Sequence, residues 1–168
     1  MEVFIIAAVS VNGMIAEEKD QVSLDWTSKD DLQFFIEKTK EAGVVVMGRT
    51  TYETIGKPLK GRLNVVMTRH PEDQVNIDGE LEWTSDPPEE IVKKLKLEGR
   101  QKVAICGGAS IYSLFLHEGL VTDLYLTVEP VIFGNGTPLV SSLGRLDLQL
   151  IEHQKLGEQA VMLHYKIK

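Results

Sequence analysis

Two arginine side chains follow short apolar runs of the sequence, at positions from which they could bind an anion. Arg49 comes after the run at 44–47, and Arg69 comes after the run at 63–68. Both runs are rich in β-branched residues, which predicts two buried parallel strands, and open α/β sheets bind ligands at the carboxyl ends of such strands. The two guanidinium groups therefore suit a phosphate, although solvated arginines are also common on protein surfaces.

A short helix is predicted between these two strands. Thr50 or Thr51 can cap it, and the spacing from Thr50 to Glu53 is that of a capping box, in which each side chain bonds the other residue's free N–H group. Gly and Pro residues at 56–61 end the helix. Its N-terminus brings unpaired N–H groups and the positive end of a dipole to the same edge of the sheet, which favours a phosphate there.

A glycine pair marks a second strand-to-helix turn. The predicted strand at 102–106 is followed by Gly107 and Gly108 and then by a short helix. Glycines at such a turn let the phosphates of a ligand approach the backbone, but a glycine pair is also typical of an ordinary tight turn.

An acidic residue lies beside the apolar stripe of a further predicted helix. The stripe comprises Leu32, Phe35, Ile36 and the methyl group of Thr39. Both Thr27 to Asp30 and Ser28 to Asp31 have capping-box spacing, and acids in a first helical turn are stabilising in any protein. On a helical wheel Asp30 points away from the stripe, whereas Asp31 flanks it. A carboxylate beside apolar surface is unusual, which makes Asp31 a candidate functional group.

The segment from Gly48 to Asn64 resembles dihydrofolate reductases. The family pattern there is Gly-Arg-x-Thr-aromatic-Glu-x-Ile-Gly-(Arg/Lys)-Pro-Leu-x-Gly-Arg-x-Asn, and every specified position is matched. Residues 107–112 match a second pattern, Gly-Gly-x-x-(Ile/Val)-Tyr. The order of the Gly and Pro residues makes a chance match improbable. The resemblance runs over nearly the whole chain and implies one α/β domain at 1–168, with a mostly parallel central sheet, an antiparallel C-terminal hairpin and helices on both faces.

The resemblance implies that NADPH is the cofactor and that 7,8-dihydrofolate is the substrate. Asp31 takes the place of the acid that binds the pterin ring, Trp26 lies near it, and Thr127 hydrogen-bonds the acid, so these three residues are the implied catalytic residues. The implied substrate-binding residues are Ile6, Ala7, Asp31, Leu32, Phe35, Ile55, Leu59, Arg62 and Thr127. The implied cofactor-binding residues are Ala8, Ile15, Ala16, Gly48, Arg49, Thr50, Thr51, Thr68, Arg69, Cys106, Gly107, Gly108, Ala109, Ser110, Ile111 and Tyr112.

Two details of the cofactor site follow from the same resemblance. The peptide bond between Gly107 and Gly108 is expected to be cis. Ile15 and Ala16 lie in a polar loop at 10–25, which closes over the nicotinamide in the family. The loop looks longer here by a few residues, and Asp25 stands where a proline commonly precedes Trp26.

The remaining sequence predicts further elements of the sheet. Strands are expected at 3–9, 81–83 and 123–128, and a C-terminal hairpin around 148–152 and 161–167. A helix is expected after Asp86, with that residue as its cap and prolines in its first turn. No His, Asp or Glu spacing resembles a metal site.

The segment at 129–138 departs from monomeric dihydrofolate reductases and resembles two relatives. One is a dimeric branch of the thermophile type, and the other is the reductase domain of riboflavin biosynthesis. The first resemblance predicts a homodimer with Val131, Ile132 and Phe133 as candidate contacts.

Composition limits the partners. The 168 residues carry a net charge of −7 and have 43% hydrophobic residues, which suits one folded domain whose field repels nucleic acids and anionic membranes. The single cysteine, Cys106, excludes an internal disulfide and suits a reducing compartment. The apolar run near the N-terminus is too short to span a bilayer, so we expect a cytoplasmic protein with a small-molecule substrate.

Three functions remain open. Arg62 suits the glutamate carboxylate of dihydrofolate but also the ribose phosphate of a riboflavin precursor. Ile55 and Leu59 favour dihydrofolate, since they would form apolar walls around a p-aminobenzoyl group that the pyrimidine lacks. A non-catalytic nucleotide-binding protein is the third hypothesis, and the presence of Asp31 argues against it.

Overall fold

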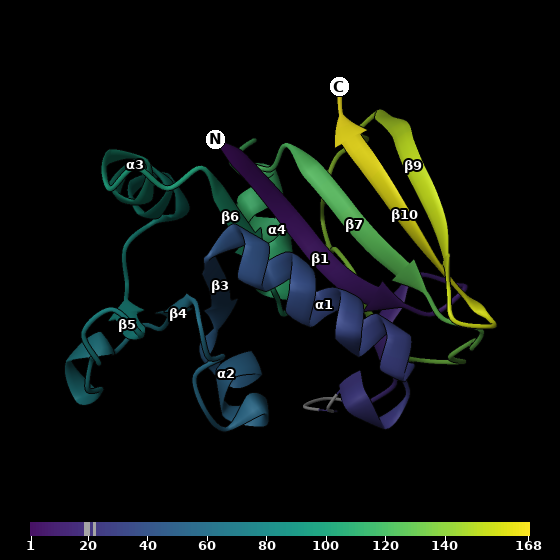
Figure 1. The fold of residues 1–168 in the computed structure, drawn as a ribbon, viewed down its shortest axis with the longest axis horizontal. Coiled ribbons are helices and arrows are strands. Elements are labelled where there is room, and N and C mark those ends of the chain that lie inside the picture. The colour runs from purple at the N-terminus through teal and green to yellow at the C-terminus, as the bar shows by residue number, and fades with distance from the viewer. Residues whose placement is uncertain (19–20, 22) are drawn as a thin grey trace.

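The computed structural model describes residues 1–18, 21 and 23–168. Its centre is an eight-stranded sheet with the strand order β5-β4-β3-β6-β1-β7-β10-β9 (Figure 1). The strands span Glu2–Val9 (β1), Val44–Gly48 (β3), Leu63–Met67 (β4), Leu81–Thr84 (β5), Lys102–Ile105 (β6), Asp123–Val128 (β7), Leu148–Leu156 (β9) and Ala160–Ile167 (β10). β10 is antiparallel to β7 and β9, and the other neighbours are parallel, which confirms the predicted fold class.

Four α-helices in the described ranges cover the two faces of this sheet. They span Lys29–Ala42 (α1), Arg49–Ile55 (α2), Pro88–Leu97 (α3) and Ala109–His117 (α4). In Figure 1, α1 runs across the near face of the sheet and α4 lies on the far face. None of the helices in the described part of the chain is long and apolar enough to cross a membrane.

The side chains of β1 show how the two faces divide. Phe4 and Ile6 pack in the layer that also holds apolar side chains of α1 and α2, whereas Val3 and Ile5 pack in the layer of α3 and α4. Successive residues of a strand point to opposite faces, so an unbroken apolar run serves both layers.

Ser28 caps α1, because its Oγ accepts a hydrogen bond from the backbone N–H of Asp31 at 3.1 Å. The predicted capping box is only half formed, because the N–H of Ser28 donates to Glu129 instead of Asp31. The predicted cap of α2 is wrong. Gly48 is its N-cap without a side-chain bond, and Thr50 and Thr51 lie inside the helix. The reason is a distant contact: the N–H of Gly48 donates to the carbonyl of Gly107 at 2.8 Å, so the helix starts directly at the strand end.

The cap predicted for α3 is also wrong. Pro87 is the N-cap, no side chain bonds the helix start, and the backbone N–H of Asp86 donates to Thr84 Oγ1 at 3.0 Å. A proline disfavours the helical conformation in the residue before it, so Pro87 and Pro88 delay the start of the helix.

The loop at 10–25 contains a strand that the sequence did not reveal. Met14–Ala16 (β2) pairs with Thr137–Pro138 (β8) as a separate two-stranded sheet. A Cβ atom at Gly136 would collide with the carbonyl of Ala16, so the approach of these segments requires glycine there. The predicted closure of this loop involves residues 19, 20 and 22, which lie outside the described residues.

Asn64 in β4 fixes the loop that carries two predicted substrate contacts. Its side chain is fully buried, accepts a bond from the N–H of Leu59 at 2.9 Å, and donates to the carbonyls of Leu59 and Arg62 at 3.0 and 2.9 Å. Buried amides need such partners, and these bonds set the path of residues 59–62.

Candidate active site

The first turn of α1 lies against the end of β7. Asp31, in this turn, is partly buried, and its carboxyl group is hydrogen-bonded by the side chain of Thr127, which is 1% exposed. The structure therefore brings together the predicted acid and the predicted threonine, which are 96 positions apart in the sequence (127 − 31). Asp30 is exposed and points elsewhere, as the helical wheel predicts.

The surroundings of Asp31 raise its pKa from 3.8 to about 6. Burial is the largest cause, because removing a carboxylate from water disfavours its charged form. The bond from Thr127 lowers the pKa, and the negative charge of Glu129 raises it further. A carboxyl group with this pKa exchanges protons near neutral pH, as a general acid or base requires.

Glu129 is a member of the site that the sequence analysis missed. Its side chain is 3% exposed, and its Oε1 accepts two hydrogen bonds from Ser28, one from the N–H at 2.8 Å and one from the hydroxyl at 2.7 Å. The alternation of side chains along a strand could have identified Glu129. It follows Thr127 by two positions, so the two side chains should lie on the same face of the strand.

Trp26 lies beside this turn, as predicted. Its ring packs edge-on against Phe133, with the ring centroids 5.1 Å apart. Its indole N–H is buried and has no hydrogen-bond partner among the described residues. Buried donors are nearly always bonded, so an N–H group without a described partner is an unusual feature of this turn.

Phe133 was predicted as a dimer contact, and this is wrong. It is 7% exposed within the chain, and its backbone is held by the side chain of Asn12, which donates to its carbonyl at 2.7 Å and accepts from its N–H at 3.2 Å. Its contact with Trp26 comes from a segment more than 100 residues away, which local sequence could not reveal.

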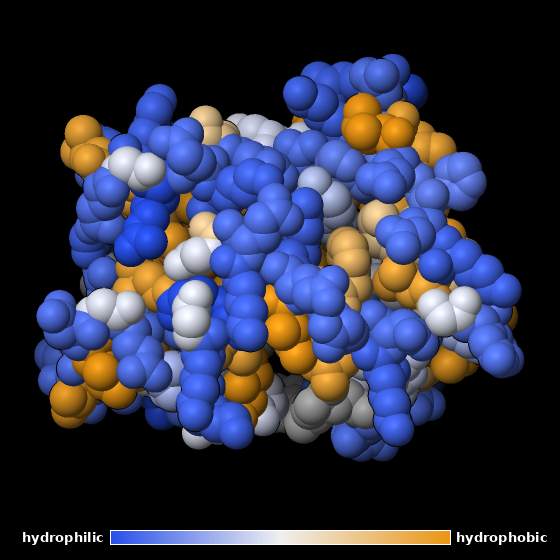
Figure 2. Space-filling view, in the orientation of Figure 1, coloured by the Kyte–Doolittle hydropathy of each residue, from blue (hydrophilic) through white to orange (hydrophobic). Residues whose placement is uncertain are grey.

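Apolar side chains continue from Asp31 towards α2. Phe35, Ile55 and Leu59 are partly buried and pack against the core layer of α1 and α2. Figure 2 shows apolar surface between these two helices, within a face that is otherwise mostly polar. An aromatic substrate group could cover this surface, which is the place predicted for the p-aminobenzoyl group.

Arg62 lies at the far end of the same strip. It is 8% exposed, and its guanidinium donates to the hydroxyl of Thr39, to the carbonyl of Ile36 at 3.4 Å and to the carbonyl of Lys60 at 3.2 Å. These bonds fix the plane of the guanidinium group.

The two glycine turns predicted to hold the cofactor touch each other. The bond between Gly48 and Gly107 joins them, and the peptide bond between Gly107 and Gly108 is cis, as expected. A Cβ at Gly107 would lie 2.9 Å from the hydroxyl of Tyr112, so no side chain fits there. A Cβ at Gly108 would have only Thr51 Oγ1 within 4 Å, at 3.5 Å, so the surface of the turn is open there.

The other residues predicted for substrate and cofactor also lie along this edge of the sheet. Ile6, Ala7 and Ala8 belong to the carboxyl half of β1, and the hydroxyl of Tyr112 donates to the carbonyl of Ile6 at 3.0 Å. The rest lie in β2, directly after β4 and β6, or in α1 and α4: Ile15, Ala16, Leu32, Thr68, Cys106, Ala109, Ser110 and Ile111. Burial raises the pKa of the Cys106 thiol to about 12, so this residue forms an inert wall.

The two arginines are exposed, and Arg49 lies near acidic groups. Arg49 pairs with Glu53 at 2.6 Å, in place of the predicted capping box, and Asp73 adds to the negative charge around it. The pair is solvent-exposed on both sides, so a phosphate could displace Glu53 at little cost.

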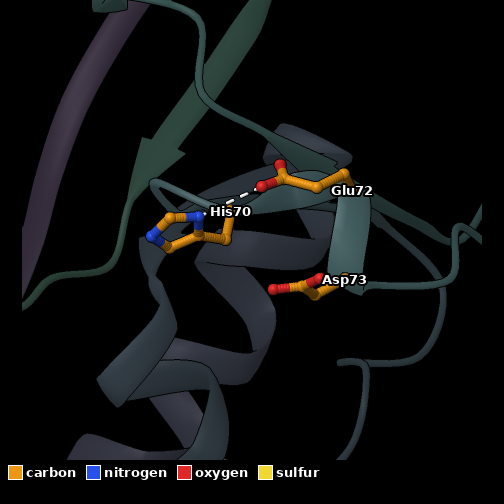
Figure 3. A group of neighbouring side chains, drawn as sticks. All are labelled: His70, Glu72 and Asp73. Carbon is orange, nitrogen blue, oxygen red and sulfur yellow. Dashed lines mark hydrogen bonds and ion pairs between the residues drawn. The ribbon is translucent and has the colours of Figure 1, made fainter.

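Three possible metal ligands gather on the turn after Arg69. The ligand atoms of His70, Glu72 and Asp73 lie within 4.8 Å of one another, and His70 Nδ1 is 3.1 Å from Glu72 Oε1 (Figure 3). All three side chains are exposed, and such groups are common on surfaces without a metal. They therefore carry no metal assignment.

The raised pKa of Asp31 predicts a pH-dependent effect on stability. Because the pKa of Asp31 is higher in the folded chain, protonation of this group adds to the free energy of unfolding. This contribution is complete below pH 3.8 and is lost as the pH rises through about 6. Asp31→Asn should therefore raise the free energy of unfolding at pH 8 by about 1 to 3 kcal/mol, and should change it little at pH 4. Urea denaturation at the two pH values measures this.

The matched control is Asp30→Asn in the same turn. It should show the same small effect at both pH values, because Asp30 is exposed. An equal effect of Asp31→Asn at pH 4 and pH 8 would contradict the assignment of a raised pKa.

Comparison with known proteins places this site in a family. The family model for dihydrofolate reductase matches residues 2–159. Dihydrofolate reductase type 3 of Salmonella typhimurium is 33% identical over 91% of this chain and 88% of its own length. A putative riboflavin biosynthesis protein from Shewanella sp. PV-4 has the same fold, with a TM-score of 0.83 and 19% identity over 100% of this chain and 99% of its own.

A second solved structure has the same fold. It is a diaminohydroxyphosphoribosylaminopyrimidine deaminase/5-amino-6-(5-phosphoribosylamino)uracil reductase from Thermotoga maritima, with a TM-score of 0.81 and 15% identity over 99% of this chain and 56% of its own. At such identity the two structures show the fold alone. The family match and the Salmonella relative together show that the chain belongs to the dihydrofolate reductase family, as an oxidoreductase of that fold.

Proposed function

We propose that the protein reduces 7,8-dihydrofolate to tetrahydrofolate with NADPH. The observation that carries the proposal is the Asp31 carboxyl group, held by Thr127 at one end of an apolar strip that Arg62 closes at the other. Dihydrofolate offers a matching order of groups, with a pterin ring, a p-aminobenzoyl group and a carboxylate tail. The family membership supports the same reaction.

The chain's own residues bind the substrate and manage its proton. Asp31 accepts hydrogen bonds from the 2-amino group and N3 of the pterin, which fixes the ring and raises the basicity of N5. Bound NADPH supplies the hydride that C6 receives. N5 must gain a proton in the same reaction, and a water molecule at the ring would deliver it.

Asp31 also discriminates between dihydrofolate and the alternative substrate. A uracil ring of the kind named for the Thermotoga protein carries a carbonyl oxygen at C2, where a pterin carries an amino group. A carboxylate beside that oxygen would repel it, whereas the amino group donates to the carboxylate. Asp31 therefore favours a 2-amino pyrimidine ring, although a riboflavin precursor that carries a 2-amino group remains a second candidate.

Asp31 gives the test of this function. NADPH oxidation should be observed with dihydrofolate and be slower with the riboflavin precursor. Asp31→Asn keeps the shape of the side chain but removes its charge, and it should lower turnover at least tenfold, about 1.4 kcal/mol of barrier, with NADPH affinity nearly unchanged.

Asp30→Asn is the control and should leave turnover intact. An inactive Asp30 variant would place the functional acid one residue earlier. Cofactor binding without turnover of either substrate would instead establish the non-catalytic alternative.

Cofactor preference is a second test. NADPH differs from NADH by a phosphate on a ribose, and Arg49 and Arg69 are the positive charges at this edge that we expect to bind it. Replacing both with glutamine should reduce the preference for NADPH by roughly 2 to 4 kcal/mol, the range of one or two charge-assisted hydrogen bonds. The ratio of kcat/KM for the two cofactors measures it, and Arg100→Gln, on an exposed turn after α3, serves as the control. An unchanged ratio would place the phosphate elsewhere.

We also propose a homodimer. Ile132 is 73% exposed, and the edge strand β9 exposes Leu150 and Ile151 at 51% and 48%. Exposed apolar edge strands readily pair with a second chain. Light scattering at micromolar protein should give twice the 18.8 kDa mass of the chain, and Leu150→Glu should halve it, whereas Val75→Glu, at an exposed site outside β9, should not. A monomeric wild type would disprove the proposal.

A further inference from the structure

Glu129 joins the end of β7 to the start of α1. Its backbone N–H continues the pairing of β7 with β1 by donating to the carbonyl of Val9 at 2.9 Å. Its side chain then receives both hydrogen bonds that Ser28 donates, and Ser28 Oγ accepts the N–H of Asp31. A continuous set of bonds thus runs from Glu129 through Ser28 to Asp31.

A second side chain from the same face of the strand also contacts the first turn of α1. Thr127 and Glu129 are two positions apart, so both side chains face the first turn of α1. Thr127 holds the carboxyl group of Asp31, and Glu129 holds the backbone on which Asp31 is carried. The N-terminus of α1 is the positive end of a dipole and offers the N–H of Ser28 to Glu129, which favours the buried carboxylate of Glu129 there.

We propose that Glu129 is a positioning residue for the reduction: by holding Ser28 it fixes the first turn of α1, so that Asp31 presents its carboxyl group to the substrate ring. The proposal rests on the proposed function for its kinetic consequences. Its structural consequences can be measured without turnover.

The negative charge of Glu129 also affects Asp31, and this effect can be measured separately from the hydrogen bonds to Ser28. Glu129 raises the pKa of Asp31, as stated above. Tyr112, on α4, is the other titratable group that acts electrostatically on Asp31 from a packed element, and burial raises its pKa so far that it stays neutral. Asp30, on the same helix, points towards the hairpin turn at Gly157. Glu129 is therefore the charged group, within the described part of the chain, whose removal should lower the pKa of Asp31.

Two substitutions separate hydrogen bonding from charge. Glu129→Gln keeps an oxygen that can accept both bonds from Ser28 but removes the charge. Ser28→Ala removes the hydroxyl that links Glu129 to Asp31 but keeps the charge. A role limited to capping the helix predicts no effect of Glu129→Gln on Asp31.

Carbon-13 NMR of the aspartate carboxyl groups in the cofactor-free protein is the first measurement, with the Asp31 signal identified by its loss in Asp31→Asn. Glu129→Gln should lower the midpoint of the Asp31 titration by about half to one pH unit. Ser28→Ala should leave the midpoint near its wild-type value. Glu158→Gln, an exposed glutamate that lines the groove outside the first turn of α1, is the matched control and should change nothing.

Kinetics with dihydrofolate is the second measurement. Asp31 titrates near pH 6, so kcat/KM should show a transition there, and Glu129→Gln should shift this transition to lower pH. Glu129→Ala and Ser28→Ala should lower kcat by roughly tenfold or more while NADPH affinity remains unchanged.

An unchanged Asp31 titration in Glu129→Gln, together with wild-type kcat in Ser28→Ala, would overturn the proposal. A wild-type protein that reduces neither substrate would disprove the proposed function. The NMR titration would still decide whether Glu129 acts on Asp31, so the two failures are distinguishable.

Discussion

The attachment of the first turn of α1 to the end of β7 is the constraint on which the candidate active site depends. Asp31 lies 96 positions before Thr127, and no local preference of either segment brings them together. The sheet does so, because β7 is the direct neighbour of β1 and α1 crosses the face that β1 shares with it. The side chains of Thr127 and Glu129, at the end of β7, then fix one turn of the helix, and the orientation of the apolar strip follows from that turn.

The burial of the Asp31 charge in this attachment lowers the stability of the fold at neutral pH. A helix N-terminus favours a negative charge by about 0.3 to 1 kcal/mol, up to roughly 2 in buried positions, and the bond from Thr127 acts in the same direction. The pKa of Asp31 is nevertheless raised to about 6, so burial and the neighbouring carboxylate outweigh both favourable effects. A charge kept where it is unfavourable is typical of a functional group, because stability alone would select a neutral residue there.

The parts of this structure that the sequence predicted are those determined by short-range pattern. The run at 44–47 forms a strand because β-branched residues in an unbroken apolar series suit burial on both faces. Ser28 caps α1 because its partner is three residues away. Long-range contacts decided the rest: α2 begins at Arg49 because Gly107 holds Gly48, a residue 59 positions earlier. Glu129 was missed for the same reason, since its bonding partner lies 101 positions away.

The distribution of charge is compatible with the anionic cofactor that we propose. The net charge of −7 acts over the whole surface, but salt screens exposed charges beyond about 8 to 10 Å, so the local groups decide binding. The turns after β3 and β6 bring two helix N-termini and an open glycine surface together, and Arg49 and Arg69 follow neighbouring strands. The carboxyl groups of Asp31 and Glu129 lie at the start of a different helix, α1. Separate elements thus carry the two kinds of charge, so proton exchange at Asp31 can be adjusted by Glu129 without altering the groups that we expect to bind the phosphates.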